Sequence, residues 1–140
     1  MVSETIGVLP LFNPDHELEH VPEQVLRWRK ELAACDGVVF FSPEYAHDMP
    51  GLVKNALDWV VGSGELVHKQ VAVINASPNH LGAEKVHQKM KYLLKVMSAD
   101  VVDASCMNIA EISQKIDSNG KITDENLKNR LYRSMDYFIK

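Results

Sequence analysis

Two short apolar runs without polar alternation constrain the fold of this chain more than any other feature. Residues 37–41 read Gly-Val-Val-Phe-Phe, and residues 70–76 read Gln-Val-Ala-Val-Ile-Asn-Ala. A strand covered by helices on both faces has this pattern, whereas a strand with one face in water alternates apolar and polar residues. Both runs therefore predict central strands of a parallel sheet.

Segments with apolar residues at helical spacing lie between and around these runs. They predict helices over 22–34, 51–61 and 83–98, and a last helix capped by Thr123 with Asp124 and Glu125 in its first turn. Weaker strands are predicted over Ile6–Phe12 and near 101–103. Because strands alternate with helices, we expect right-handed crossovers and an α/β fold with helices on both faces of a mostly parallel sheet.

Composition excludes several classes of partner. The chain has 140 residues, of which 46% are hydrophobic, enough for one domain over 1–140 with its own core. The net charge is -4 with scattered Lys and Arg, so we expect no nucleic acid partner. No apolar run reaches the roughly 20 residues of a membrane span, and the first residues do not resemble a signal peptide. We expect a cytoplasmic protein without a membrane partner, with Cys35 and Cys106 as free thiols and no metal site.

The loops after the two central strands are the candidate ligand site. In an open parallel sheet, small ligands bind beyond the carboxyl ends of the strands. The first loop, 42–51, offers the flat ring of Tyr45 and ends at Gly51, where a helix begins with free N–H groups. The second loop, 77–82, offers Ser77 and further backbone donors, with Gly82 allowing close approach. These features alone predict a ligand crevice of unspecified chemistry.

Residues 42–59, Ser-Pro-Glu-Tyr-Ala-His-Asp-Met-Pro-Gly-Leu-Val-Lys-Asn-Ala-Leu-Asp-Trp, resemble the signature of the NADPH-dependent FMN reductase family. The resemblance extends to 9–15 upstream and to 75–78 and 122–124 downstream, so it covers nearly the whole chain. It implies a flavodoxin-like three-layer sandwich.

The resemblance also implies a function. It indicates an oxidoreductase in which bound FMN accepts hydride from NADPH or NADH and passes electrons to a small-molecule acceptor, a quinone or a flavin. No dedicated catalytic acid, base or nucleophile is expected, because hydride moves directly between the rings. By motif position the residues that border the flavin are Pro43, Glu44, Tyr45, Ala46, Ser77 and Pro78. Members are typically homodimers or homotetramers, so Glu44 is also a candidate oligomer contact.

The chain departs from the family pattern at its N-terminus. Members begin with a strand, a phosphate-binding loop of the Gly-Ser-x-Arg type and a helix, and Met1 corresponds to a point just before the second strand. In the strand order 2-1-3-4-5 this leaves a vacant lane beside 37–42. We expect Ile6–Leu9 to shift into the lane, a second chain to cover it, or the sequence to be part of a longer protein.

Two functional classes follow. The first is an NAD(P)H-dependent flavin or quinone reductase that binds FMN weakly, because each charge-assisted phosphate hydrogen bond that is lost is worth about 1.5 to 3 kcal/mol. The second is a catalytically impaired family member that retains the fold and acts as a binding or oligomerising subunit through its exposed sheet edge.

Overall fold

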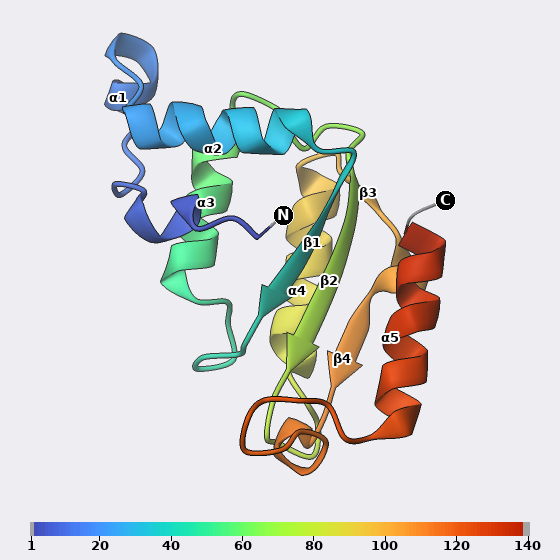
Figure 1. Cartoon of the computed structure of the whole chain (residues 1–140). Helices are drawn as coiled ribbons and strands as arrows, with labels where there is room; N and C mark the ends of the chain where they lie inside the picture. The colour runs from blue at the N-terminus through green and yellow to red at the C-terminus, as the bar shows by residue number, and fades with distance from the viewer. Residues whose placement is uncertain (1, 139–140) are drawn as a thin grey trace.

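The computed structural model describes residues 2–138, and its main elements agree with those predicted (Figure 1). Three helices and two strands fall within two residues of their predicted bounds: α2 Glu23–Ala34, β1 Gly37–Ser42, α3 Gly51–Val61, β2 Gln70–Ala76 and α4 Glu84–Val96. The last helix, α5, covers Glu125–Phe138. Its cap differs from the prediction, because Asp124 Oδ1, and not Thr123, accepts a hydrogen bond from Leu127 N at 2.6 Å.

All strand pairings within the sheet are parallel, with β2 in the centre. β1 pairs with β2 over its whole length, from Gly37 opposite Gln70 to Ser42 opposite Asn75. On its other side β2 pairs first with β3, Asp100–Val101, and then with β4, Met107–Ile109. These two short strands occupy one lane, interrupted by the 3-10 helix η2, Asp103–Ser105. Sequence analysis placed a single strand at 101–103 and missed β4.

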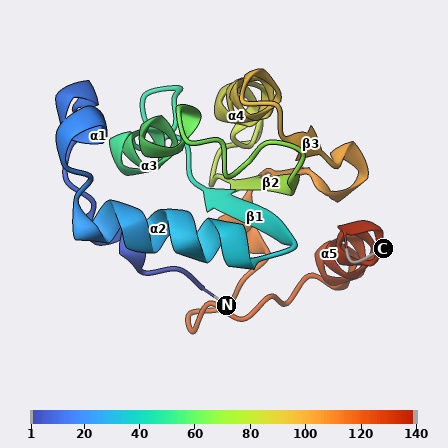
Figure 2. The same ribbon diagram turned by 90° about the horizontal axis from the view of Figure 1, so that it is seen from above.

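Helices cover both faces of the sheet (Figure 2). On one face α2, α3 and α4 pack on β1 and β2 around fully buried residues that include Leu57, Val60, Val73, Met90 and Leu94. On the other face α5 packs through Leu127, Leu131 and Met135 against Ile74 and β4. The predicted three-layer α/β architecture is therefore present, although one helix alone covers the second face of this sheet among the described residues.

The predicted strand over Ile6–Phe12 is wrong. Thr5–Val8 forms the 3-10 helix η1, and the following residues satisfy their backbone groups with side chains of α3 instead of a neighbouring strand. Asn55 accepts from Phe12 N at 2.8 Å and donates to Pro10 O at 2.9 Å, and Trp59 Nε1 donates to the same carbonyl at 2.8 Å. Ile6–Leu9 therefore does not fill the vacant lane. A short helix, α1, follows at Pro14–Glu19.

β1 is less enclosed than its sequence predicts. Among residues 2–138 it pairs on one side only, with β2, and most of its residues are half-buried. Phe41 is 68% exposed, because α5 does not extend over this end of the strand. None of the helices in the described part of the chain is both long and apolar enough to cross a lipid bilayer.

Candidate functional site

The two candidate loops begin side by side at the carboxyl edge of the sheet, at the lower end of β1 and β2 in Figure 1. Ser42 lies opposite Asn75 in the parallel register, so the chain leaves both strands at the same level. The fully buried Asn75 also donates from Nδ2 to Ser42 O at 2.8 Å. The structure thus brings together the two loops that the sequence separates by more than thirty residues.

Glu44 joins the first loop to the helix that follows the second. Its side chain is 11% exposed, and Oε2 accepts a hydrogen bond from Val86 N in the first turn of α4 at 3.0 Å. Oε1 lies 3.2 Å from His47 Nδ1. The Val86 bond is the largest cause that holds the pKa of Glu44 below its ordinary value, and burial opposes it. The residue before α4, Ala83, provides no side-chain cap, so a carboxylate from another loop caps this helix.

The tip of the first loop is a tight two-residue hairpin. Tyr45 and Asp48 exchange two backbone hydrogen bonds of 2.9 Å, and the residues between them, Ala46 and His47, have φ values of 49° and 63°. Positive φ at both central positions is the geometry of a turn that Asn and Gly adopt most readily. The Tyr45 ring is 64% exposed. Within the described chain the amides of Glu44, Ala46 and His47 donate no hydrogen bond, so they face solvent or a ligand.

The second loop is more fully committed to its own structure. Ser77 is buried, and its amide donates to Ile109 O at 3.0 Å while its Oγ accepts from Asn79 N at 3.2 Å. Pro78 is exposed beside it. The Ser77 amide is therefore not free for a ligand, because Ile109 of β4 accepts its hydrogen bond.

Asn75 and His87 form a buried polar pair next to the first residues of the two loops. Asn75 Oδ1 lies 2.9 Å from Nδ1 of His87, a residue of α4 that is 7% exposed. Burial, followed by the charge of Lys91, holds the pKa of His87 below its ordinary value. A neutral imidazole with the proton on Nδ1 donates to the Asn75 carbonyl, which completes the chain of bonds to Ser42.

Beside the loops lies an apolar hollow of about 360 Å³ between the carboxyl ends of the strands and the start of α5. Its lining includes Pro43, Ala76, Ile109, Ile112 and Ile122. Side chains therefore do not fill the space next to the Pro43 loop. A flat aromatic ring with a polar edge matches an apolar hollow next to uncommitted backbone amides.

The fit to FMN differs between its two ends. The first loop and the hollow suit the isoalloxazine ring, which has apolar faces and a polar edge. The N-terminus of α4 is not available to the phosphate, because the Glu44 carboxylate already occupies it. A second negative group there meets a like charge.

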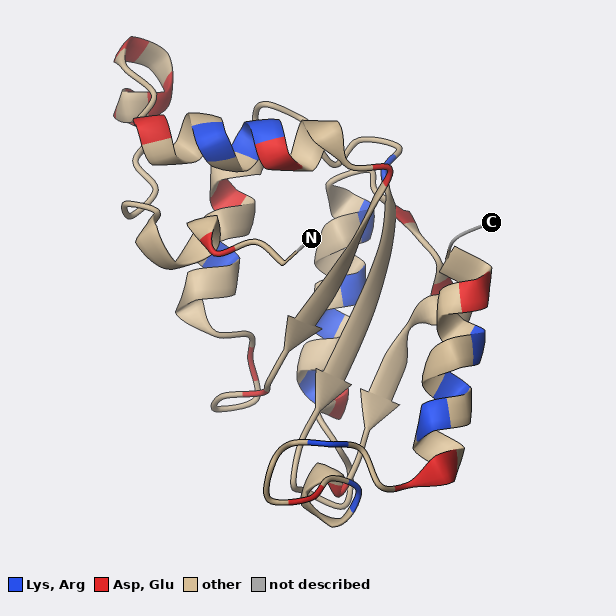
Figure 3. Ribbon diagram, in the orientation of Figure 1, with Lys and Arg blue, Asp and Glu red and all other residues tan. Residues whose placement is uncertain are grey.

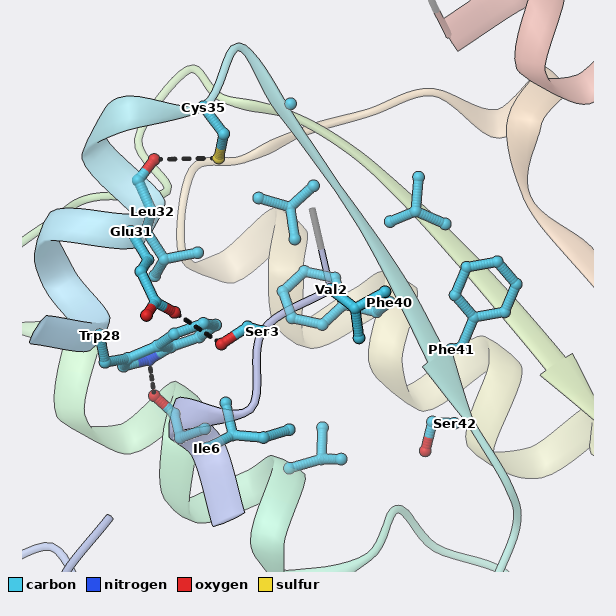
Figure 4. A pocket seen from close by; sticks show the side chains of 15 residues that line it. Val2, Ser3, Ile6, Trp28, Glu31, Leu32, Cys35, Phe40, Phe41 and Ser42 are labelled. Atoms are coloured by element: carbon cyan, nitrogen blue, oxygen red, sulfur yellow. Dashed lines mark hydrogen bonds between the residues drawn. The ribbon is translucent and has the colours of Figure 1, made fainter. Parts of the chain in front are cut away.

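An open groove of about 470 Å³ runs along the unpaired edge of β1 (Figure 4). Phe40 points toward α2 and α3 on one side, whereas Phe41 points away from them. The groove is mainly apolar. Its charged residue, Glu31, accepts hydrogen bonds from the hydroxyls of Ser3 and Thr5, both at 2.6 Å. The groove lies where the sequence analysis expects a vacant lane.

Charges are dispersed over the described surface (Figure 3). Basic positions on α4 pair with acidic ones: Lys91 Nζ lies 2.6 Å from Asp103 Oδ1, and Lys89 contacts Asp48 of the first loop. The latter pair adds a second connection between the first loop and α4.

Comparisons with known proteins agree with this architecture. The model of the NADPH-dependent FMN reductase family matches residues 3–114. A 2-hydroxy-1,4-benzoquinone reductase of Burkholderia sp is 29% identical over 136 residues, which cover 95% of this chain and 74% of that protein. A quinone reductase of Pseudomonas putida is 32% identical over 128 residues, 86% of this chain and 66% of that protein. The chain thus spans about two thirds to three quarters of these relatives.

A solved structure gives the same picture. FerB from Paracoccus denitrificans, described as a flavoenzyme NAD(P)H:(acceptor) oxidoreductase, superposes with a TM-score of 0.79 at 30% identity, covering 96% of this chain and 75% of that one. This likeness confirms the predicted flavodoxin-like fold class. Because the family match covers most of the chain and includes both loops, the chain belongs to the NADPH-dependent FMN reductase family.

Proposed function

We propose that this chain is the ring-binding part of an NAD(P)H-dependent FMN oxidoreductase that reduces small quinones or flavins. Its family, and relatives named as quinone reductases, support the reaction class. The single observation that carries the proposal is the Glu44–Val86 hydrogen bond, which fixes the first loop to the helix that follows the second loop, beside an apolar hollow. FMN, when bound, supplies the redox chemistry by taking up hydride from NAD(P)H and releasing electrons to the acceptor.

The residues of this chain position the ring. The main-chain N–H groups of Glu44 and Ala46, which donate no hydrogen bond within the described chain, are donors for its polar edge. Pro43, which has no N–H group, borders the ring by contact, and the exposed Tyr45 ring offers a flat face. The Ser77–Pro78 turn forms the opposite wall. Glu44 has two roles: its carboxylate caps α4, and its backbone N–H group is a donor for the ligand. No side chain here is assigned a proton transfer, because hydride transfer between stacked rings requires none.

The experiment is a titration of FMN into the purified chain, followed by addition of NADPH or NADH and a benzoquinone. We expect a bound flavin spectrum that NAD(P)H bleaches and quinone restores, with an FMN Kd in the micromolar range or weaker. Tyr45→Ala should weaken binding, whereas Tyr132→Ala, at an equally exposed tyrosine of α5, should not. A chain that never binds flavin would refute the proposal. Submicromolar binding would refute the reasoning about the phosphate.

A second candidate function is an oligomerising subunit, and the unpaired edge of β1 favours it. Two copies related by a twofold axis can pair these edges antiparallel, which joins two sheets and closes both grooves. The proposed assembly is a homodimer of this kind, or a homotetramer built from it. We also propose that the protein is cytoplasmic, because a reducing compartment keeps Cys35 and Cys106 as free thiols.

The mass in solution tests this candidate. Light scattering should give a dimer or tetramer for the unmodified chain and a monomer for Phe41→Lys, which puts a charge on the edge. Leu18→Lys, at an exposed residue of α1, is the matched control and should leave the mass unchanged. A monomer at all concentrations excludes the candidate.

A further inference from the structure

The side chain of Asn108, in β4, holds the second loop in place. Its Oδ1 accepts from Ala83 N at 2.7 Å, and its Nδ2 donates to Leu81 O at 3.1 Å and to Glu84 Oε2 at 3.0 Å. One amide group thus uses its acceptor and both donor hydrogens on a single four-residue segment. No other side chain type can supply this combination from one position except Gln, which is longer.

Gly82 shows how closely the loop rests on this amide. A Cβ at Gly82 would lie 2.4 Å from Asn108 Oδ1, and φ at Gly82 is +69°. The close contact with Asn108 therefore requires glycine at this position. The loop's own internal bonds are few: Gly82 N donates to Asn79 O at 3.1 Å, and Asn79 N donates to Ser77 Oγ at 3.2 Å.

The rest of the loop is at the surface. Pro78, Asn79, His80 and Leu81 are exposed, and the Leu81 side chain is 68% exposed. Hydrophobic packing therefore does little to fix this segment, and hydrogen bonds at its two ends determine its conformation. At the first end Glu111 N donates to Asn79 O at 2.9 Å, and at the second end Asn108 holds residues 81–84. Asn108 lies opposite Asn75 in the sheet, which places this anchor on a rigid element directly beside the site.

We propose that Asn108 is a positioning residue for flavin binding. It does not touch the ligand; it fixes residues 81–84, the end of the loop that follows the Pro78 turn, so that the turn keeps its place as the second wall of the ring site. This inference rests on the function proposed above. Removing the amide lets the turn adopt several conformations, and binding must then select one of them.

The test compares Asn108→Ala with the unmodified chain in two measurements. Amide hydrogen exchange without ligand should become about tenfold faster at Gly82 and Ala83, whose N–H groups are hydrogen-bonded in this segment. The FMN Kd should rise about tenfold, since two main-chain hydrogen bonds of ordinary net strength are lost. Visible circular dichroism of the bound flavin should also change, because the wall beside the ring moves. Asn108→Asp keeps an acceptor for Ala83 N but loses both donors and repels Glu84, so it should raise the FMN Kd while the Ala83 amide stays protected.

Two controls separate positioning from general destabilisation. Gly82→Ala disturbs the same contact from the other side and should reproduce both effects, whereas Gly120→Ala, at φ +78° in open space, should produce neither. Ser105→Ala removes a buried hydrogen bond to Ser134 O of α5, which is no part of the loop, and should leave the Kd unchanged. Unchanged exchange and Kd in Asn108→Ala would overturn the proposal. If the unmodified chain binds no FMN, the proposed function fails, and the exchange rates alone still decide whether Asn108 holds the loop.

Discussion

Replacement of Glu44 should reveal how much of the site's stability comes from one carboxylate. In Glu44→Ala, Val86 N loses its acceptor at the start of α4, and the first loop loses its connection to that helix. In Glu44→Gln the side-chain oxygen still accepts, but the charge at the N-terminus of the helix is gone. The two variants therefore separate the hydrogen bond from its charge.

The expected loss of stability in the Glu44 variants follows from the burial of the side chain and its place at the helix N-terminus. The side chain is 11% exposed, so solvent screens the interaction only partly. Loss of a helix cap costs about 0.5 to 2 kcal/mol, and the charge at a helix N-terminus contributes about 0.3 to 1 kcal/mol of it. We expect the free energy of unfolding to fall by about 1 to 2 kcal/mol in Glu44→Ala and by about half as much in Glu44→Gln.

The effect depends on pH. The pKa of Glu44 is lowered in the folded chain, chiefly by the Val86 bond, so the folded state holds its proton less tightly than the unfolded state. The stabilisation is therefore complete above the unfolded pKa, near 4.5, and is lost as the pH falls through the folded pKa. The difference between the unmodified chain and Glu44→Gln should shrink at acid pH.

Urea denaturation at several pH values measures these quantities. Glu19→Gln, at an exposed glutamate of α1, is the control for loss of a negative charge and should change the stability by less than about 0.5 kcal/mol. If Glu44→Gln is as stable as the unmodified chain at neutral pH, the helix-capping argument is wrong.

Three further predictions concern buried polar groups. Asn75→Ala should lower the free energy of unfolding by about 2 to 4 kcal/mol in urea, because Ser42 O and His87 Nδ1 lose a buried partner. The pKa of His87 is lowered in the folded chain, so below pH 6.5 the unfolded chain takes up a proton that the folded chain does not. The free energy of unfolding should therefore decrease as the pH is lowered below 6.5. Thermal melts at several pH values should show a smaller decrease in His87→Gln. Ser105→Ala removes a 2.7 Å bond to Ser134 O and should cost about 1 kcal/mol by the same urea assay; no loss would contradict a net role for that bond.

The helices and strands that could be predicted are those whose own residues show a clear apolar pattern. The apolar run at 37–41 and the helical spacing of 51–61 each indicate an element without reference to the rest of the chain. Ile6–Phe12 has the composition of a strand, but a strand needs a partner, and Asn55 and Trp59 of α3 take its backbone groups instead. β4 was missed because three residues are too few for an alternation to be visible.

The position of the site was predicted from the sequence, but the hydrogen bonds that hold its loops were not. The resemblance of 42–59 located both the first loop and its cofactor class. It gave no sign that the Glu44 carboxylate reaches α4, because that contact joins residues 42 positions apart. Asn108 was missed for a related reason: its role depends on β4. The sequence indicated a close approach at Gly82. The structure shows that the approaching group is the Asn108 amide of another strand.

The hairpin between Tyr45 and Asp48 has a consequence for ligand affinity. Its two central residues hold a left-handed backbone that Ala and His adopt only when the bonds on either side enforce it. A loop already confined in this way has little motion left to lose when a ring docks against it, so the entropic cost of association is small. Glycine at Ala46 would relieve the backbone but restore that motion. The strained backbone at Ala46 therefore lowers the entropic cost of binding.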